Sequence, residues 1–110
     1  MPQQSCKVVV IFITCPSSDE ARGIIRSLLS KRLVACANII KGIDSSFWWN
    51  GRIDKAKEVL IVAKTIRDKF RALENEVRRL HSYEVPEIIA LPVIFGSTGY
   101  IKWVEREVKS

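Results

Sequence analysis

Two strand patterns flank a turn signal in the stretch from Leu33 to Thr65, LVACANIIKGIDSSFWWNGRIDKAKEVLIVAKT. The apolar, β-branched segments Leu33–Ile40 and Glu58–Thr65 favour strands. Asn50-Gly51 between them is the strongest short signal for a two-residue hairpin turn. Gly42 interrupts the first arm and predicts a β-bulge. The stretch therefore predicts a hairpin whose arms are about two to three times the usual length of roughly 5–6 residues.

A strand and an amphipathic helix precede this hairpin. Lys7–Thr14 is short and β-branched, which indicates a strand buried on both faces and central in its sheet. Ser17 begins a capping-box pattern with Glu20. The apolar spacing of three and four that follows indicates a helix ending near Lys31 and Arg32. Its apolar stripe consists of Ala21, Ile24, Ile25, Leu28 and Leu29.

A second amphipathic helix and a fourth strand follow the hairpin. Thr65 is the expected N-cap of this helix. Its apolar stripe consists of Ile66, Phe70, Leu73, Val77 and Leu80. Ile88–Phe95 predicts the fourth strand, and Pro92 within it favours an edge position or a bulge. Either Ser97 or Thr98 can cap a last short helix. The apolar side of that helix would consist of Tyr100, Ile101, Val104 and Val108.

This order of elements is the split βαβ pattern. It predicts an α+β, ferredoxin-like βαββαβ sandwich with a long hairpin between the second and third strands and a short C-terminal helix. Two helices would cover one face of the sheet. Because the strands are almost continuously apolar, we expect partner chains to cover the other face. We expect residues 1–110 to form a single domain in which residues 1–6 are a polar N-terminal tail.

The composition restricts the class of protein. The chain carries a formal net charge of +6, which permits anionic ligands, but its basic residues are scattered over the predicted helices. No apolar run approaches the roughly 20 residues of a membrane span, and the first residues lack the apolar region of a signal peptide. Cys6, Cys15 and Cys36 cannot all pair within one chain. We expect a cytoplasmic protein without a membrane partner, with Cys36 as a small core residue.

Titratable side chains are concentrated at the junction of the second helix and the fourth strand. They are His81, the only histidine, with Tyr83, Glu84 and Glu87. A rigid scaffold can present such groups as a site. Thiol and imidazole suit copper or zinc, which makes His81, Cys15 and Glu84 or Glu87 candidate metal ligands. The alternative is a helix C-terminus with a proline-stiffened loop, where His81 favours the negative helix end.

Neither nucleophilic catalysis nor RNA binding is favoured. Cys15 lies at the end of a strand before a helix, a location that can favour the thiolate. A Cys/His hydrolase would need it to meet His81, and the spacing does not require this. RNA-recognition domains share the predicted topology, but their stacking pattern of strand aromatics is absent here. We therefore expect a protein that is not an enzyme and binds no nucleic acid or organic cofactor.

Three large aromatic residues, Phe47, Trp48 and Trp49, stand at the hairpin tip. Such groups are costly to leave in water. Because alternate strand residues point the same way, Phe47 and Trp49 form the predicted oligomer interface, and Trp48 faces the other side. The alternative is that these aromatics fold back onto the core of their own chain.

Five motifs in a fixed order extend over nearly the whole chain, from Val8 to Val104. They are Thr14-Cys15-Pro16, Leu33–Ile40, Trp49–Ile53, Glu58–Leu60 with Lys64-Thr65, and His81–Pro92. Together they resemble the CutA family of divalent-cation tolerance proteins. The resemblance implies a ferredoxin-like subunit in a homotrimer similar in architecture to the PII signalling proteins. It also implies metal tolerance, with copper or another divalent ion as the ligand and no enzymatic activity.

The resemblance carries site expectations as well. With the ligand chemistry above, it points to His81, Cys15 and Glu84 as the metal set. Some family members carry a second histidine and a strand cysteine as copper ligands, and Leu80 and Ile13 stand at those positions here. Of that set only His81 is present.

A second departure and an alternative site complete these expectations. Ser82 replaces the proline that commonly follows the histidine. The PII-like alternative is a pocket between subunits for a small molecule or anion. Its lining would include Lys64, Tyr83 and Trp49, with Glu84 beside them.

Overall fold

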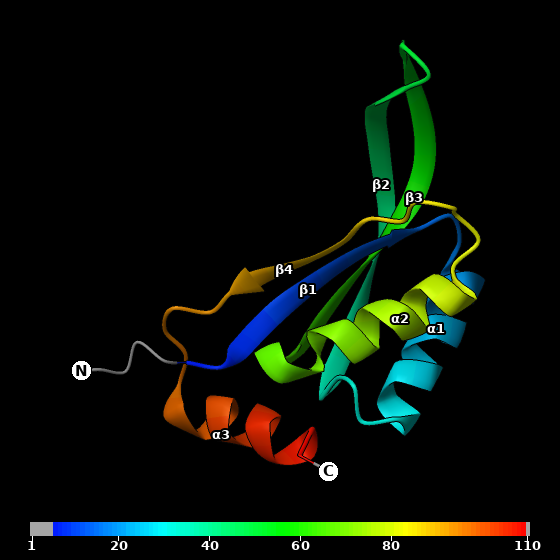
Figure 1. Ribbon diagram of the computed structural model, residues 1–110. Coiled ribbons are helices and arrows are strands. Elements are labelled where there is room, and N and C mark those ends of the chain that lie inside the picture. Colours follow the sequence, from blue (N-terminus) through cyan, green and yellow to red (C-terminus); the bar gives the residue numbers. More distant parts are fainter. Residues whose placement is uncertain (1–5, 110) are drawn as a thin grey trace.

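Strand β1 (Val8–Cys15) runs through the middle of a four-stranded sheet with the order β2-β3-β1-β4. It pairs antiparallel with β3 on one side and β4 on the other. This confirms its predicted central position (Figure 1). The structure, a computed structural model, describes residues 6–109, so most of the predicted N-terminal tail lies outside the described residues.

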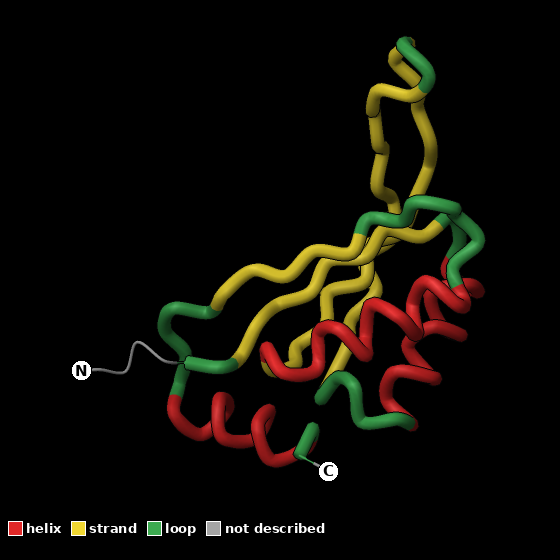
Figure 2. Tube along the Cα trace, viewed as in Figure 1, coloured by secondary structure: helices red, strands yellow, loops and turns green. Residues whose placement is uncertain are grey.

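Two helices pack on one face of this sheet. Helix α1 (Ser18–Ser30) begins as predicted, because the Ser17 hydroxyl accepts a hydrogen bond of 3.2 Å from the Glu20 backbone N–H. Helix α2 (Phe70–Leu80) lies beside it (Figure 2). We call the sheet surface beneath them the helix-covered face, represented by Ile11, Ile13, Ile61 and Ala63, which are all 0% exposed. These residues join Ala21, Ile24, Leu28, Leu33, Val34, Leu73 and Val77 in one core.

The start of α2 differs from the prediction. Thr65 belongs to β3 (Arg52–Ile66) and pairs with Val9, so it is not an N-cap. A short 3₁₀ turn, η2 (Arg67–Lys69), follows the strand before α2 begins. The sheet ladder continues to Ile66, and this tertiary pairing overrides the local capping preference. The Thr65 hydroxyl oxygen is buried without a hydrogen-bond partner among the described residues.

Strand β4 (Ile88–Pro92) lies at the edge of the sheet, as Pro92 indicated. It is shorter than the predicted Ile88–Phe95. The last pair of its ladder joins Pro92 to Val9, close to the first residue of β1. The predicted extension to Phe95 was therefore wrong, because the chain beyond Pro92 has almost no β1 left to pair with.

The hairpin joins β2 (Cys36–Trp49) to β3 and projects away from the sheet (Figure 1). Asn50 and Gly51 both have positive φ, 52° and 76°, as a type I′ turn requires. The predicted bulge is present as well. The register shifts between Ile40 and Ile43, and Gly42 between them has φ 76°.

Helix α3 (Thr98–Glu107) closes one end of the sheet. Its Val104 and Val108 are fully buried, as predicted, and so is Val8 at the start of β1. Tyr100 is 41% exposed, but its hydroxyl lies 3.3 Å from the Cys36 sulfur. No helix among residues 6–109 is both long and apolar enough to span a bilayer.

Together these elements form the predicted α+β, ferredoxin-like βαββαβ arrangement with its long hairpin and C-terminal helix.

Candidate functional site

His81 ends α2 and is held inside the junction by both ring nitrogens. Its Nε2 lies 2.7 Å from the Thr14 carbonyl oxygen, and its Nδ1 lies 3.0 Å from the Tyr83 backbone nitrogen. Since a carbonyl only accepts and a backbone N–H only donates, Nε2 carries the proton and Nδ1 accepts. The side chain is 0% exposed. His81 therefore connects the end of β1 to the loop after α2.

Glu20 reaches the same junction from the first turn of α1. One of its carboxylate oxygens, Oε2, accepts hydrogen bonds from the Ser82 backbone N–H at 2.8 Å and the Ser82 hydroxyl at 3.0 Å. This oxygen also lies 3.4 Å from His81 Nδ1. Sequence reasoning placed Glu20 only in a capping box, because nothing in its spacing relates it to a loop 62 residues later.

Tyr83 and Glu58 form a second pair beside His81. The Tyr83 hydroxyl donates to a Glu58 carboxylate oxygen at 2.8 Å, and Glu58 is only 8% exposed. Burial of the phenol, with help from its bond to Glu58, raises the pKa of Tyr83 to about 12. Tyr83 was predicted to line a pocket, whereas Glu58 was missed. Its only signal was a carboxylate at the start of an apolar run.

Cys15 is fully buried next to these acids. Burial is the first cause, and the negative charges of Glu20 and Glu58 add to it, so the pKa of the Cys15 thiol rises to about 12. The expectation that its location favours a thiolate was wrong, because desolvation and two carboxylates oppose ionisation. A protonated thiol is a weak nucleophile and a poor metal ligand.

The predicted metal set is not gathered into a metal centre within one chain. Glu84 is exposed, while His81 and Cys15 are buried. Among residues 6–109, no three His, Cys, Asp or Glu side chains are arranged to hold a metal ion. Both nitrogens of His81 are used in hydrogen bonds and the Cys15 thiol is protonated. These residues, as they lie, do not fit a bound divalent ion.

The predicted pocket residues lie on one side of the molecule but do not meet. Lys64, on β3, donates to the Asn38 side-chain oxygen at 2.8 Å. Trp49 is at the hairpin tip and is 53% exposed. Tyr83 is at the Glu58 junction. A pocket that contained all three would need more than one chain.

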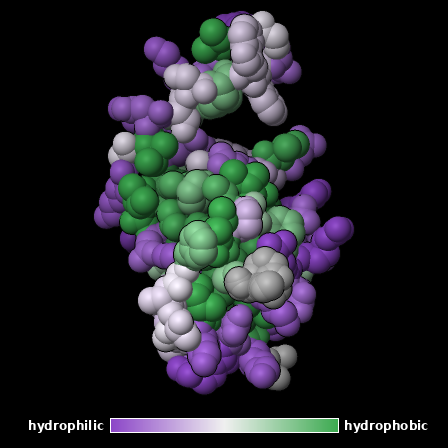
Figure 3. Space-filling model, turned by 90° about the vertical axis from the view of Figure 1, so that its left-hand side faces the viewer, coloured by the Kyte–Doolittle hydropathy of each residue, from purple (hydrophilic) through white to green (hydrophobic). Residues whose placement is uncertain are grey.

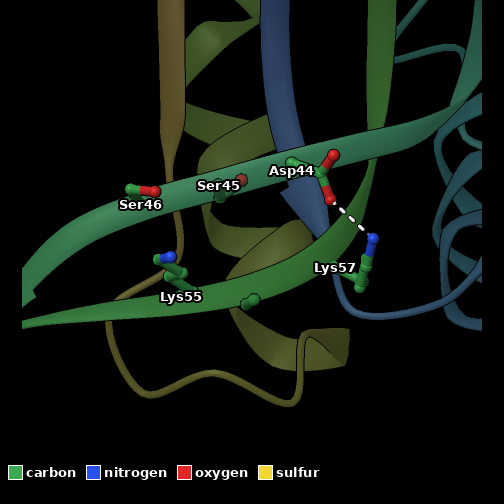
Figure 4. A pocket seen from close by; sticks show the side chains of 6 residues that line it. Asp44, Ser45, Ser46, Lys55 and Lys57 are labelled. Atoms are coloured by element: carbon green, nitrogen blue, oxygen red, sulfur yellow. Dashed lines mark ion pairs between the residues drawn. The ribbon is translucent and has the colours of Figure 1, made fainter.

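The cavities of the described chain follow the hairpin instead. Figure 4 shows the larger, an open groove at the neck where an ion pair of 2.8 Å joins Asp44 to Lys57. Its other lining residues are Ser45, Ser46, Lys55 and Ala56. A smaller groove at the tip contains Trp49, the only predicted pocket residue in either of these two grooves.

The sheet surface opposite α1 and α2 is apolar and largely uncovered. We call it the outer face, and its members are Val10, Phe12, Ile40, Leu60, Val62, Ile89 and Leu91. Ile40 and Ile89 are each 47% exposed, and the others are at least partly exposed. Figure 3 shows apolar side chains gathered below the projecting hairpin. Cys36 lies on this face and is half-buried, so its assignment to the core was wrong.

The bulge makes the outer face continuous with one side of the hairpin. Before the bulge Ile40 pairs with Leu60, and after it Ile43 pairs with Glu58. The extra residue therefore changes the parity of β2 residues on this side. As a result, Phe47 and Trp49 continue the outer face, whereas the pair of Trp48 and Ile53 lies on the opposite side of the hairpin.

The profile of the CutA1 divalent ion tolerance protein family matches residues 9–107. The chain belongs to this family. It is 41% identical over 97 residues to the divalent-cation tolerance protein CutA of Thermus thermophilus, a match that covers 88% of this chain and 94% of that protein. It is 43% identical over 103 residues to the human protein CutA, with 94% and 58% coverage. The chain thus spans little more than half the length of the human relative and of the rice chloroplastic CutA 1, of which 57% is covered.

Solved CutA structures agree with this fold. The T. thermophilus divalent cation tolerance protein is 39% identical, with a TM-score of 0.89 over 91% of this chain and 97% of that one. The periplasmic divalent cation tolerance protein CutA of Archaeoglobus fulgidus is 40% identical, with a TM-score of 0.90 over 93% and 99%. The names of these CutA relatives describe cation tolerance, and none describes a catalysed reaction.

Proposed function

We propose that this chain acts in divalent-cation tolerance as a homotrimer, that the whole chain functions as one domain, and that it catalyses no reaction. Membership of the CutA1 family supports the general role. The protonated thiol of Cys15 supports a non-enzymatic role, because it is the candidate nucleophile of the chain and its pKa is raised to about 12.

The observation that carries this proposal is the uncovered outer face. Phe12, Val62 and Leu91 lie on three adjacent strands, and no helix of the same chain covers them. Apolar surface of this extent marks an interaction site in a soluble protein. Other copies of the same chain are the proposed cover, because the hairpin side that bears Phe47 and Trp49 continues this surface.

The ligand we propose is copper or another divalent ion, bound by the assembled trimer. His81, Cys15 and Glu84 do not form a three-ligand group within one chain. Assembly can bring donor groups of neighbouring subunits together, since side chains on the outer face and the hairpin would meet their counterparts there. This makes metal affinity depend on the trimer.

A second candidate is a PII-like pocket between subunits for a small molecule or anion. Lys64 lies on the outer-face side of β3, and Trp49 lies on the hairpin side continuous with it. Tyr83 contacts Glu58, which pairs with Ile43 on that same surface. The surface that would be shared between chains therefore contains all three predicted pocket residues.

Titration of the purified protein with copper, zinc and a set of anions tests both candidates. We expect a trimer by sedimentation and a saturable calorimetric response to Cu²⁺ or Zn²⁺. Leu91→Asp places a charge on the outer face and should yield monomers that lose this response. A wild-type protein that is monomeric, or a trimer that binds no divalent ion, would overturn the proposal. Binding of an anion alone would support the second candidate.

We propose residence in the cytoplasm, which the three free cysteines support because disulfides are rare there. Relatives named as chloroplastic and periplasmic show that CutA proteins occupy other compartments as well. Fractionation of cells with an antibody against the protein tests this location, and recovery in another compartment would contradict it.

A further inference from the structure

We infer that His81 is a positioning residue that orients Tyr83 and, through it, Glu58, and that its imidazole is not a metal ligand. The inference rests on the proposed divalent-cation function and narrows it, because it removes this histidine from the set of donors.

The first step concerns the lone pairs of the ring. A metal ion binds the lone pair of an unprotonated imidazole nitrogen. In His81 the proton is on Nε2, which donates to the Thr14 carbonyl at 2.7 Å. The only available lone pair is on Nδ1, and it accepts the Tyr83 N–H at 3.0 Å. Ligation would therefore displace a hydrogen bond of a buried group and leave a backbone donor without its partner.

The second step concerns what holds the Tyr83 N–H in place. The preceding residue, Ser82, donates both its backbone N–H and its hydroxyl to one oxygen of Glu20, at 2.8 and 3.0 Å. These two bonds anchor the loop to α1. A proline at position 82 would lack the N–H and could make neither bond. In this chain the loop therefore resists the movement that would free His81 Nδ1.

The third step concerns the neighbours that a metal ion would need. The Glu20 oxygen nearest to His81 already accepts two hydrogen bonds, and Glu58 accepts one from Tyr83. No two of the required donors are free at this position. The arrangement instead has a clear structural result. His81 holds the Tyr83 backbone, the two rings lie 4.8 Å apart, and the Tyr83 hydroxyl holds Glu58.

Two substitutions separate a positioning role from a ligand role. His81→Asn keeps a side-chain acceptor that can bond the N–H two residues later, as in an Asx turn, but removes the imidazole. His81→Ala removes both. We expect calorimetric Kd values for Cu²⁺ and Zn²⁺ in His81→Asn within about twofold of wild type. We also expect the Tyr83 amide to remain protected from hydrogen exchange in His81→Asn and to exchange at least tenfold faster in His81→Ala.

Nitrogen-15 NMR of the wild-type ring provides a readout that does not depend on folding of a variant. We expect the Nε2–H tautomer, with both nitrogen shifts unchanged when zinc is added. A zinc-dependent shift of Nδ1, or a loss of metal affinity of tenfold or more in His81→Asn, would overturn the inference. Equal Tyr83 exchange in His81→Ala and wild type would overturn the positioning role. A wild-type protein that binds no metal at all would refute the proposed function, while the tautomer and the exchange rates would still decide this inference.

Discussion

The two faces of the central sheet are built from similar residues but have different surroundings. On β3, Ile61 is 0% exposed beneath the helices, whereas its neighbour Val62 points to the outer face and remains accessible. On β1, Ile13 is buried, whereas Phe12 is only partly covered. Apolar character alone therefore does not distinguish a face covered by the chain's own helices from one left for other molecules.

The difference between the faces has a simple origin in chain length. Helices α1 and α2 are both used on one face, and α3 covers only the end near Val8. No further helix among residues 6–109 is available for the outer face. The apolar residues there can be removed from water only by association, and we expect substitutions on the two faces to respond differently to protein concentration.

The largest expected effect is on the helix-covered face. Ile61→Ala should lower the free energy of unfolding by about 2–5 kcal/mol, because it leaves a cavity in a closely packed core. Chemical denaturation at several protein concentrations measures this, and the loss should be the same at each. Val62→Ala is the matched control on the same strand. Its smaller effect should grow as the protein is diluted, and a concentration-independent loss there would contradict association through the outer face.

The second effect sharpens the comparison on the hairpin. Replacing Phe47 and Trp49 together by alanine should weaken association by about 2 kcal/mol or more, as truncation of well-packed interface aromatics does. Light scattering should show a shift from trimer toward monomer or aggregate. Trp48→Ala, on the opposite side of the hairpin, is the control and should change the mass less. The reverse ranking would mean that the other hairpin side forms the interface.

A third effect tests the bulge that connects the outer face to the hairpin. Gly42 has φ 76°, so Gly42→Ala should destabilise the protein by about 1–2 kcal/mol. Gly23→Ala in α1 is the matched control, since a Cβ there meets nothing within 4 Å. It should be neutral or stabilise by about 0.5–1 kcal/mol. Thermal unfolding measures both, and equal effects would argue against a conformational need for glycine at position 42.

The smallest effect is a pH dependence confined to the helix-covered side. Its bond to Arg79 is the first cause, with Ser27 and Lys31 of α1 assisting, and the pKa of Glu76 is lowered from 4.5 to about 2. The stabilisation is therefore present above pH 4.5 and is lost as the pH falls from 4.5 toward 2. Glu76→Gln should flatten this part of the stability curve. Glu74→Gln on the same helix is the control, and an unchanged curve in Glu76→Gln would refute the assignment.

Local signals in the sequence identified the elements correctly where the deciding interaction was itself local. The Ser17 cap, the Gly42 bulge and the Asn50-Gly51 turn each depend on residues within a few positions of one another. The motif order likewise predicted the CutA family. Thr65 was assigned wrongly because its backbone is used in a ladder with β1, 56 positions away in sequence at Val9.

The candidate site was located by sequence but not composed by it. The concentration of titratable groups after α2 pointed to His81 and Tyr83. The partners that determine their chemistry, Glu20 and Glu58, come from α1 and β3. The protonated state of Cys15 follows from burial next to those same two carboxylates, and no spacing along the chain encodes it.

By itself, then, the sequence determined the order of elements, the turn, the bulge and the family, because propensity, capping and backbone sterics act over short distances. Only the tertiary structure decided which apolar face is covered, where β4 ends and what His81 contacts. These outcomes depend on the register between strands and on packing across the sheet. A shift of one residue, such as the one at Gly42, changes which side of the hairpin Phe47 and Trp49 occupy.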